Sequence, residues 1–259
     1  MTKCALQSEA ARETLEHFCS YPLDSSREVL EKFAELPDAV SCFDGEKKNF
    51  VYVPGSRPDR VVLVAHADTV WDRYYGKTVS GEQSLKAEGD LYKGTNPDLG
   101  IGADDRSGCA ILWLLKDSGH SLLVVDGEER RQIGSHHLRT SYPELFRELN
   151  EHAYMIQFDR RNGNDYKCYS LPVTHSFRRM IQKRIGYRDA GKNSRTDIIV
   201  LCEKICGVNL SVGYYGEHTP DEHLVFSEWF RTLSLAEALL ERKQKRYPLK
   251  KAGFGLFSF

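Results

Sequence analysis

Short apolar runs rich in β-branched residues alternate with segments of helical periodicity along most of this 259-residue chain. The apolar runs have the length and composition of buried strands and cover residues 61–66, 121–126, 153–159 and 207–216. The apolar positions of residues 105–119, 141–151, 174–186 and 222–245 have the spacing of helices that pack one face on a sheet. This alternation predicts an α/β fold with a mixed, mostly parallel central sheet flanked by helices.

The first hundred residues or so follow a different pattern. Residues 8–21 and 26–37 have the pattern of two short helices that are separated at Pro22. Residues 48–55 and 59–66 look like a hairpin of two strands that enters the sheet. Residues 71–98 are polar, aromatic and rich in glycine, which predicts a long loop over one edge of the sheet.

Three of the predicted strands end in side chains that bind metals. His66 ends the first apolar run, Glu128 and Glu129 follow the second, and Asp159 ends the third. In an open α/β sheet, ligands bind outside the carboxyl ends of the strands. Imidazoles and carboxylates are ligands that zinc accepts. The sequence therefore predicts a metal site at this edge.

The spacing of these polar residues also suits metal chemistry. His66 and Asp68 are two positions apart, so on an extended chain they face the same way, and Asp68 can fix the metal-binding nitrogen of His66. The side chains of Glu128 and Glu129 are adjacent and diverge on an extended segment. One of them can therefore bind metal while the other acts as a base on a metal-bound water.

A set of motifs in this order resembles the co-catalytic dinuclear zinc exopeptidase superfamily. The motifs are His-x-Asp at His66, Gly-Ala-Asp-Asp-Arg-Ser-Gly around Asp104, Glu-Glu followed by Gly-Ser, Phe-Asp at Asp159, and His-Thr-Pro-Asp-Glu from His218. The resemblance covers roughly residues 60 to 235 and implies a zinc aminopeptidase-like, phosphorylase/hydrolase-like fold.

The resemblance also implies a role for each matched residue. His66 and Asp159 would hold one divalent metal ion, Glu129 and His218 the other, and Asp104 would bridge the two. Asp68 would orient His66, and Glu128 would be the general base that acts on a metal-bridging water. Zinc is the expected metal, and cobalt or manganese are the alternatives.

One spacing favours the lidless, aminopeptidase-like branch of this superfamily. Carboxypeptidase and deacylase members carry a complete dimerisation domain between the aspartate ligand and the last histidine. Here Asp159 and His218 are 59 positions apart (218 − 159), and the residues between them already contain predicted strands and a helix. We therefore expect residues 1–259 to form a single catalytic domain. Thr196 and Asp197 resemble a segment that lines the site in that branch, although Asp197 could equally cap a helix.

The substrate class stays open at this point. The preferred hypothesis is an aminopeptidase or dipeptidase, and the alternatives are a metal-dependent deacylase or carboxypeptidase-type amidohydrolase, or a metal-binding member of the fold without peptidase activity. Glu217, Asp221 and Glu222 are candidates to bind a substrate amine. Arg160 and Arg161 could instead clamp a carboxylate by paired hydrogen bonds.

The chain departs from the family pattern after Glu129. Arg130 and Arg131 stand where relatives place a small apolar residue and a glycine. Glycine often answers a need for positive φ, so Arg131 predicts that this loop takes another path. The two arginines are either ordinary surface residues or a cationic rim that favours acidic substrates.

The composition of the chain limits the classes of binding partner that we expect. A net charge of −1 and a pI near 6.8 give no electrostatic reason to expect nucleic acid or an anionic membrane as a partner. No apolar run is long enough for a membrane span, no signal peptide is evident, and seven scattered cysteines suit a reducing compartment. We expect a cytoplasmic protein that acts on a peptide or an acylated amino acid. The sequence leaves open whether the chain forms a homo-oligomer.

Overall fold

The computed structural model describes residues 3–72 and 83–250, which form helices around a main sheet of eight strands. The strands lie in the order β1-β2-β6-β3-β7-β10-β8-β9. Their bounds are β1 Val40–Cys42, β2 Phe50–Val53, β3 Val62–His66, β6 Ser121–Val125, β7 Met155–Arg160, β8 Asp165–Lys167, β9 Arg188–Asp189 and β10 Gly207–Ser211.

The centre of this sheet is parallel and its margins are mixed. β6, β3, β7 and β10 are parallel neighbours, whereas β2 pairs antiparallel with β6 and β8 pairs antiparallel with β10. The four central strands are buried along their whole length apart from the last two residues of β7. This burial explains their continuous apolar runs, and the predicted α/β class with a mostly parallel sheet is confirmed.

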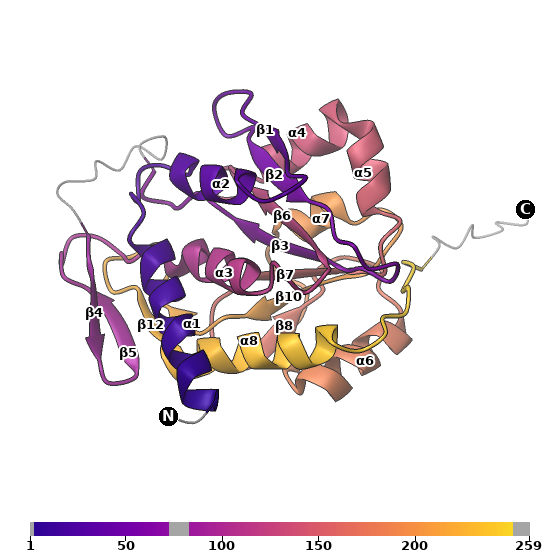
Figure 1. Ribbon diagram of the computed structural model, residues 1–259. Helices are drawn as coiled ribbons and strands as arrows, with labels where there is room; N and C mark the ends of the chain where they lie inside the picture. The colour runs from indigo at the N-terminus through magenta and orange to yellow at the C-terminus, as the bar shows by residue number, and fades with distance from the viewer. Residues whose placement is uncertain (1–2, 73–82, 251–259) are drawn as a thin grey trace, which may run out of the picture.

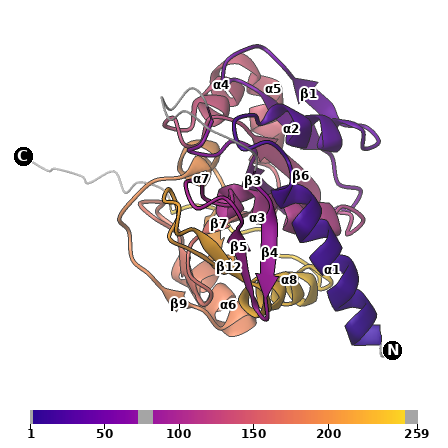
Figure 2. The ribbon, with the colours of Figure 1, turned by 90° about the vertical axis from the view of Figure 1, so that its left-hand side faces the viewer.

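Helices cover both faces of the main sheet. α1 (Lys3–Cys19), α2 (Arg27–Ala34), α3 (Ala103–Leu114) and α8 (Phe226–Leu240) lie on one face, and α4 (Ile133–Ser141), α5 (Pro143–Leu149) and α7 (Asp197–Leu201) lie on the other (Figures 1 and 2). α6 (His175–Ile185) packs against α8. The two predicted N-terminal helices correspond to α1 and α2, on either side of Pro22.

A second, four-stranded antiparallel sheet lies beside the main one (Figure 1). It has the order β11-β12-β5-β4, with β4 at Leu85–Glu88, β5 at Leu91–Gly94, β11 at Tyr214–Tyr215 and β12 at His223–Val225. Residues 83–98 therefore contain a strand pair where the sequence predicted a loop, while residues 73–82 of that predicted loop lie outside the described residues. The helix predicted from residue 222 begins only at Phe226, because β12 comes first.

The predicted hairpin of residues 48–55 and 59–66 is wrong. β2 pairs with β6, and β6 separates β2 from β3 in the sheet. Both segments are strands, but the strand that lies between them comes from residues 121–125. Within the described residues, no helix has the length and apolar character that a membrane crossing requires.

The segment after α8 returns to the start of β3 through a charged contact. Asp59 accepts hydrogen bonds from Arg57 Nε at 3.0 Å and from the main-chain nitrogen of Gln244 at 2.7 Å. Arg57 also donates to the carbonyl oxygen of Arg242 at 3.1 Å. The hydrogen bonds from Arg57 and from the Gln244 amide lower the pKa of Asp59 to about 2.

Asp59→Asn should therefore lower the free energy of unfolding at pH 7 by about 1 kcal/mol, because the ion pair is partly screened by solvent. The folded pKa lies below the unfolded value, so this contribution is complete above about pH 4 and disappears as the pH falls towards 2. Urea unfolding at pH 7 and pH 3 measures it, with Asp24→Asn at an exposed site as the control. An equal loss at both pH values would contradict the assignment.

Candidate metal centre

The five predicted ligands meet at the carboxyl ends of the central strands. His66 is the last residue of β3, Asp159 lies near the end of β7, and Glu129 follows β6 in a short loop. Asp104 lies in the first turn of α3, and His218 lies in the loop between β11 and β12 of the second sheet. Five segments that are far apart in sequence thus supply one cluster.

Asp104 lies between the two histidines. Its Oδ1 is 3.2 Å from His66 Nε2, and its Oδ2 is 3.1 Å from His218 Nε2. Asp159 Oδ1 is 3.3 Å from His66 Nε2, and Glu129 Oε1 is 2.8 Å from His218 Nε2. The cluster therefore consists of two halves, each with one imidazole and one carboxylate of its own, and they share Asp104.

The main chain of Asp68 holds the His66 ring as firmly as its side chain does. His66 Nδ1 is 3.0 Å from the carbonyl oxygen of Asp68 and 3.4 Å from its Oδ1. The Asp68 carboxylate accepts hydrogen bonds from the main-chain nitrogens of Glu128, at 3.1 Å, and Glu129, at 3.3 Å. Asp68 thus directs Nε2 of His66 into the cluster and fixes the loop that carries the two glutamates.

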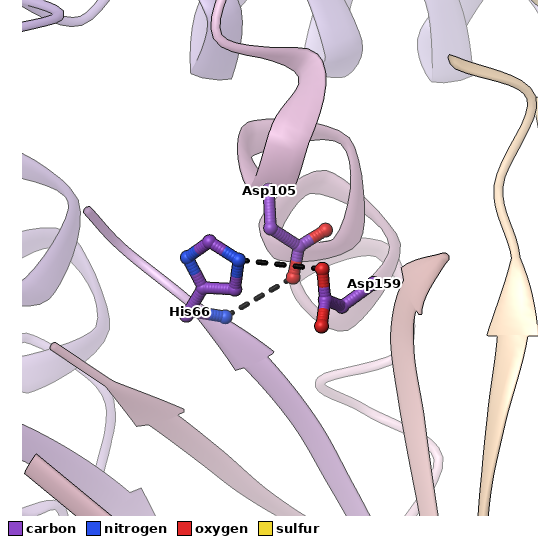
Figure 3. A group of neighbouring side chains, drawn as sticks. All are labelled: His66, Asp105 and Asp159. Atoms are coloured by element: carbon purple, nitrogen blue, oxygen red, sulfur yellow. Dashed lines mark hydrogen bonds and ion pairs between the residues drawn. The ribbon is translucent and has the colours of Figure 1, made fainter. Parts of the chain in front are cut away.

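Asp105 is close to the cluster but is bound elsewhere. One oxygen each from Asp105 and Asp159 and a nitrogen of His66 lie within 4.8 Å of one another, as do atoms of His66, Asp104 and Glu129. Figure 3 shows the Asp105 carboxylate facing the main-chain nitrogen of His66, whereas Asp159 faces the ring. Asp105 Oδ1 also accepts a hydrogen bond from the main-chain nitrogen of Gly108 in α3 at 3.0 Å. Both of its oxygens therefore stabilise the backbone, and Asp104 is the better ligand.

The side chains of Glu128 and Glu129 diverge, as the sequence predicted. Glu129 faces His218, whereas Glu128 Oε1 accepts a hydrogen bond from Gln132 Nε2 at 3.1 Å. Both glutamates line the cavity of about 390 Å³ at the cluster. Burial raises the pKa of Glu128 well above its usual value, and the nearby Asp159 carboxylate raises it further.

Hydrogen bonds on the outer side of Asp159 fix its orientation. Thr196 Oγ1 donates to Asp159 Oδ2 at 2.7 Å, and Gln157 Nε2 donates to the same oxygen at 3.0 Å. Gln157 also donates to Asp197, which accepts a further hydrogen bond from Ser135. Asp197 is buried and neither caps α7 nor faces the cavity, whereas Thr196 contacts the cluster. The sequence gives no sign that Gln157 contacts Asp159, because Gln157 lies inside an apolar strand.

The cluster strongly favours positive charge. Burial opposes protonation of His218, but contacts with Asp104 and Glu129 outweigh it and raise the pKa of His218 to about 11. The pKa of His66 is also raised well above its usual value, because Asp159 and Asp104 overcome the effect of burial. Burial and the neighbouring Asp104 raise the pKa of Glu129 to about 7. The carboxylates therefore favour positive charge beside each imidazole.

Three features fit divalent metal ions in these places. Within the described residues, Asp104 Oδ1 and Glu129 Oε1 are buried and have no hydrogen-bond partner, although each lies within ion-pair distance of an imidazole nitrogen. Ligand atoms in a tetrahedral zinc site with bonds of about 2.0–2.1 Å lie about 3.3 Å apart. The separations of 3.2 and 3.3 Å from His66 Nε2 to Asp104 and Asp159 match that spacing. The donor set of imidazoles and carboxylates suits zinc, cobalt or manganese.

The residues predicted to bind the substrate differ in their burial and in their partners. Glu222 is buried and accepts hydrogen bonds from the main-chain nitrogens of Gly102 and Asp104 at 2.8 and 3.0 Å, so it is not available to a substrate amine. Asp221 is exposed, and Glu217 lines the cavity but pairs with Arg161 at 2.6 Å. Arg160 pairs with Asp165 through two hydrogen bonds. Both predicted arginines of a carboxylate clamp therefore already contact carboxylates.

Comparison with solved structures shows which fold this is. The aminopeptidase PepT of Bacillus cereus matches with a TM-score of 0.63 and 13% identity, over 90% of this chain and 98% of its own. A tripeptidase of Staphylococcus aureus matches with a TM-score of 0.65 and 11% identity, over 90% and 98%. The TET1 peptidase of Pyrococcus horikoshii matches with a TM-score of 0.61 and 13% identity, over 89% and 99%.

The chain thus has the fold of these peptidases, which confirms the fold that the motifs implied. At these identities the likeness shows the fold alone. No model of a protein family matches the sequence, and no curated protein sequence matches it either.

Two residues of the loop between β6 and α4 have a left-handed backbone although they are not glycine. Arg131 and Gln132 have φ angles of 64° and 57°, so Arg131 adopts the positive φ for which glycine is the usual residue. That this loop takes another path than in relatives stays a prediction. Arg131 lines a cavity of about 620 Å³ together with Glu128, Glu129 and His218. Arg131 therefore borders the candidate site.

Arg131→Gly should raise the free energy of unfolding by about 0.5–1 kcal/mol, because glycine relieves the steric cost of positive φ but adds entropy to the unfolded chain. Arg130→Gly is the matched control, since Arg130 is not among the residues with positive φ, and it should lower stability. Urea unfolding of both variants measures the difference. Destabilisation by both substitutions to the same extent would contradict this interpretation.

Proposed function

We propose that this chain is a metal-dependent exopeptidase of the aminopeptidase or dipeptidase type. The observation that carries the proposal is the position of Asp104, whose two oxygens face two different imidazoles at 3.2 and 3.1 Å. Such a carboxylate suits a pair of metal ions, and a metal pair suits hydrolysis of an amide bond. The shared fold with named aminopeptidases and a tripeptidase supports this choice.

In this proposal, His66 and Asp159 would hold one ion, Glu129 and His218 would hold the other, and Asp104 would contribute to both. Zinc is the proposed metal. Bound metal ions supply Lewis acidity, which polarises the substrate carbonyl group and lowers the pKa of a water molecule. Asp68, Thr196 and Gln157 keep His66 and Asp159 in place through the hydrogen bonds described above.

Glu128 is the proposed general base. It lines the cavity beside the cluster, and its side chain contacts Gln132 and neither imidazole. Its carboxylate is therefore not one of the proposed metal ligands. Its carboxylate takes the proton of the attacking water and returns it to the nitrogen of the leaving amine. No covalent intermediate with the protein is needed.

The segment between Asp159 and His218 supports the branch without a lid domain. It forms β8, α6, β9, α7, β10 and β11. Its strands belong to the two sheets, α7 packs on β7 and β10, and α6 packs on α8. A single catalytic domain over residues 1–259 is therefore our proposal. A deacylase or carboxypeptidase-type amidohydrolase on the same metals is the alternative, because it would use the same ligands.

Glu128→Gln should retain both metal ions but lose about 10²–10⁴-fold in turnover, because only the proton transfer is removed. Glu129→Ala and His218→Ala should lose metal. Metal analysis after dialysis, together with hydrolysis of a short peptide, measures both properties. Glu144→Gln is the control, since Glu144 is an exposed carboxylate that pairs with Arg147 and does not line this cavity.

Near-normal turnover by Glu128→Gln would overturn its role as the base. Metal content equal to that of the wild type in both Glu129→Ala and His218→Ala would overturn the ligand set.

A matched pair of peptides, one with a free amino terminus and one N-acetylated, tests which end of the substrate is recognised. In the presence of zinc or cobalt, we expect the free peptide to be cleaved and the acetylated peptide to resist cleavage, because an aminopeptidase needs the charged amine. The rates are measured by chromatography of the products, with Glu128→Gln as the blank. Equal or faster cleavage of the acetylated peptide would favour the deacylase or carboxypeptidase alternative.

A further inference from the structure

Within the described residues, two of the cations that line one cavity of the candidate site lack a carboxylate partner. The cavity of about 390 Å³ beside the cluster of candidate metal ligands is lined by Arg160, Arg161, Lys167 and Arg195 in addition to the cluster carboxylates. Arg160 pairs with Asp165 and Arg161 pairs with Glu217. Lys167 and Arg195 form no ion pair within residues 3–72 and 83–250.

Lys167 is held in place although it is charged and buried. It is the last residue of β8, it is only 8% exposed, and its Nζ donates to Asn193 O at 2.7 Å and to Ser194 Oγ at 3.2 Å. Burial, followed by the repulsion of Arg160 and Arg161, lowers the pKa of Lys167. A buried ammonium group with only neutral partners is costly, and an anion in the adjoining cavity would relieve that cost.

Arg195 is carried by a segment that is anchored at both ends. Lys167 binds Asn193 and Ser194 on one side, and Thr196 binds Asp159 of the metal cluster on the other. Arg195 lines both cavities at the cluster, the one that contains Lys167 and the one that contains Arg131. Arg195 is exposed and directly precedes Thr196, so it lies beside the candidate ligands and is accessible to a ligand in the cavity.

We propose that Lys167 and Arg195 form a subsite for a carboxylate of the substrate. This inference rests on the proposed function and deepens it, because it names the substrate class as peptides with a carboxylate next to the scissile bond. If metal ions balance the charge of the cluster carboxylates, and Asp165 and Glu217 balance Arg160 and Arg161, the cavity keeps the positive charge of Lys167 and Arg195. A guanidinium group binds a carboxylate through paired hydrogen bonds.

The carboxylate could belong to an acidic side chain or to the carboxyl terminus of a dipeptide. Equilibrium binding to the metal-loaded Glu128→Gln protein separates the two sources. One pair of ligands is Glu-Ala-amide and Gln-Ala-amide, which differ only in the side-chain charge. The other pair is Ala-Ala and Ala-Ala-amide, which differ only in the terminal charge. Dissociation constants are measured by calorimetry.

We expect the charged member of one pair to bind about tenfold or more tightly than its neutral partner, the size of one charge-assisted contact. In the Glu128→Gln background, Arg195→Gln and Lys167→Gln should each abolish most of that preference, and Arg195→Lys should retain part of it. Lys192→Gln is the matched control, because Lys192 lies in the same segment but lines a different cavity. It should leave the preference unchanged.

Equal binding within both pairs would overturn the subsite, as would a preference that survives both Arg195→Gln and Lys167→Gln. Turnover of the wild type tests the proposed function separately. Hydrolysis without any carboxylate preference would reject the subsite alone, whereas the preference without hydrolysis would reject the peptidase proposal and keep the subsite.

Discussion

The structure depends on the partners of the many carboxylates that lie together at one edge of the main sheet. These carboxylates fall into two groups. Asp68, Asp105 and Glu222 accept hydrogen bonds from main-chain nitrogens, so they stabilise the backbone and are satisfied without any ion. Asp104, Glu129 and Asp159 direct oxygens at the Nε2 atoms of His66 and His218, whereas Asp68 faces only Nδ1 on the other side of the His66 ring. An oxygen that faces Nε2 of an imidazole is therefore what distinguishes the candidate ligands from their acidic neighbours.

This arrangement links folding to the binding of cations. Burial, followed by the repulsion of the neighbouring Asp104 carboxylate, raises the pKa of Glu129 to about 7. The same carboxylates raise the pKa of His218 to about 11, so a proton on the imidazole lowers the repulsion. A divalent ion would do so more strongly, since it adds charge and coordinates the oxygens directly. Its binding free energy would then contribute to the stability of the folded chain.

The sequence predicted those parts of the fold that are encoded locally. The four central strands are continuous apolar runs, and residues at their ends necessarily meet at one edge, so His66, Glu129 and Asp159 could be placed together. The partner of a strand is not encoded locally, and this is why β2 was wrongly paired with β3 instead of β6. The strands of the second sheet are short and partly exposed, so their pattern resembled that of a loop. The positive φ of Arg131 could not be predicted from the sequence, because glycine, the usual signal of positive φ, is absent at that position.

The second sheet explains how the last ligand reaches the cluster. His218 lies in the loop that joins β11 and β12, and β12 is held in place by pairing with β5, more than a hundred residues earlier in the chain. Glu222 lies in the same loop and binds the main-chain nitrogens of Gly102 and Asp104. The loop that carries His218 is therefore attached directly to the backbone of the aspartate that both halves of the cluster share. The separation of the two halves is set by this contact together with the main sheet, so the candidate metal pair is complete only when both sheets have formed.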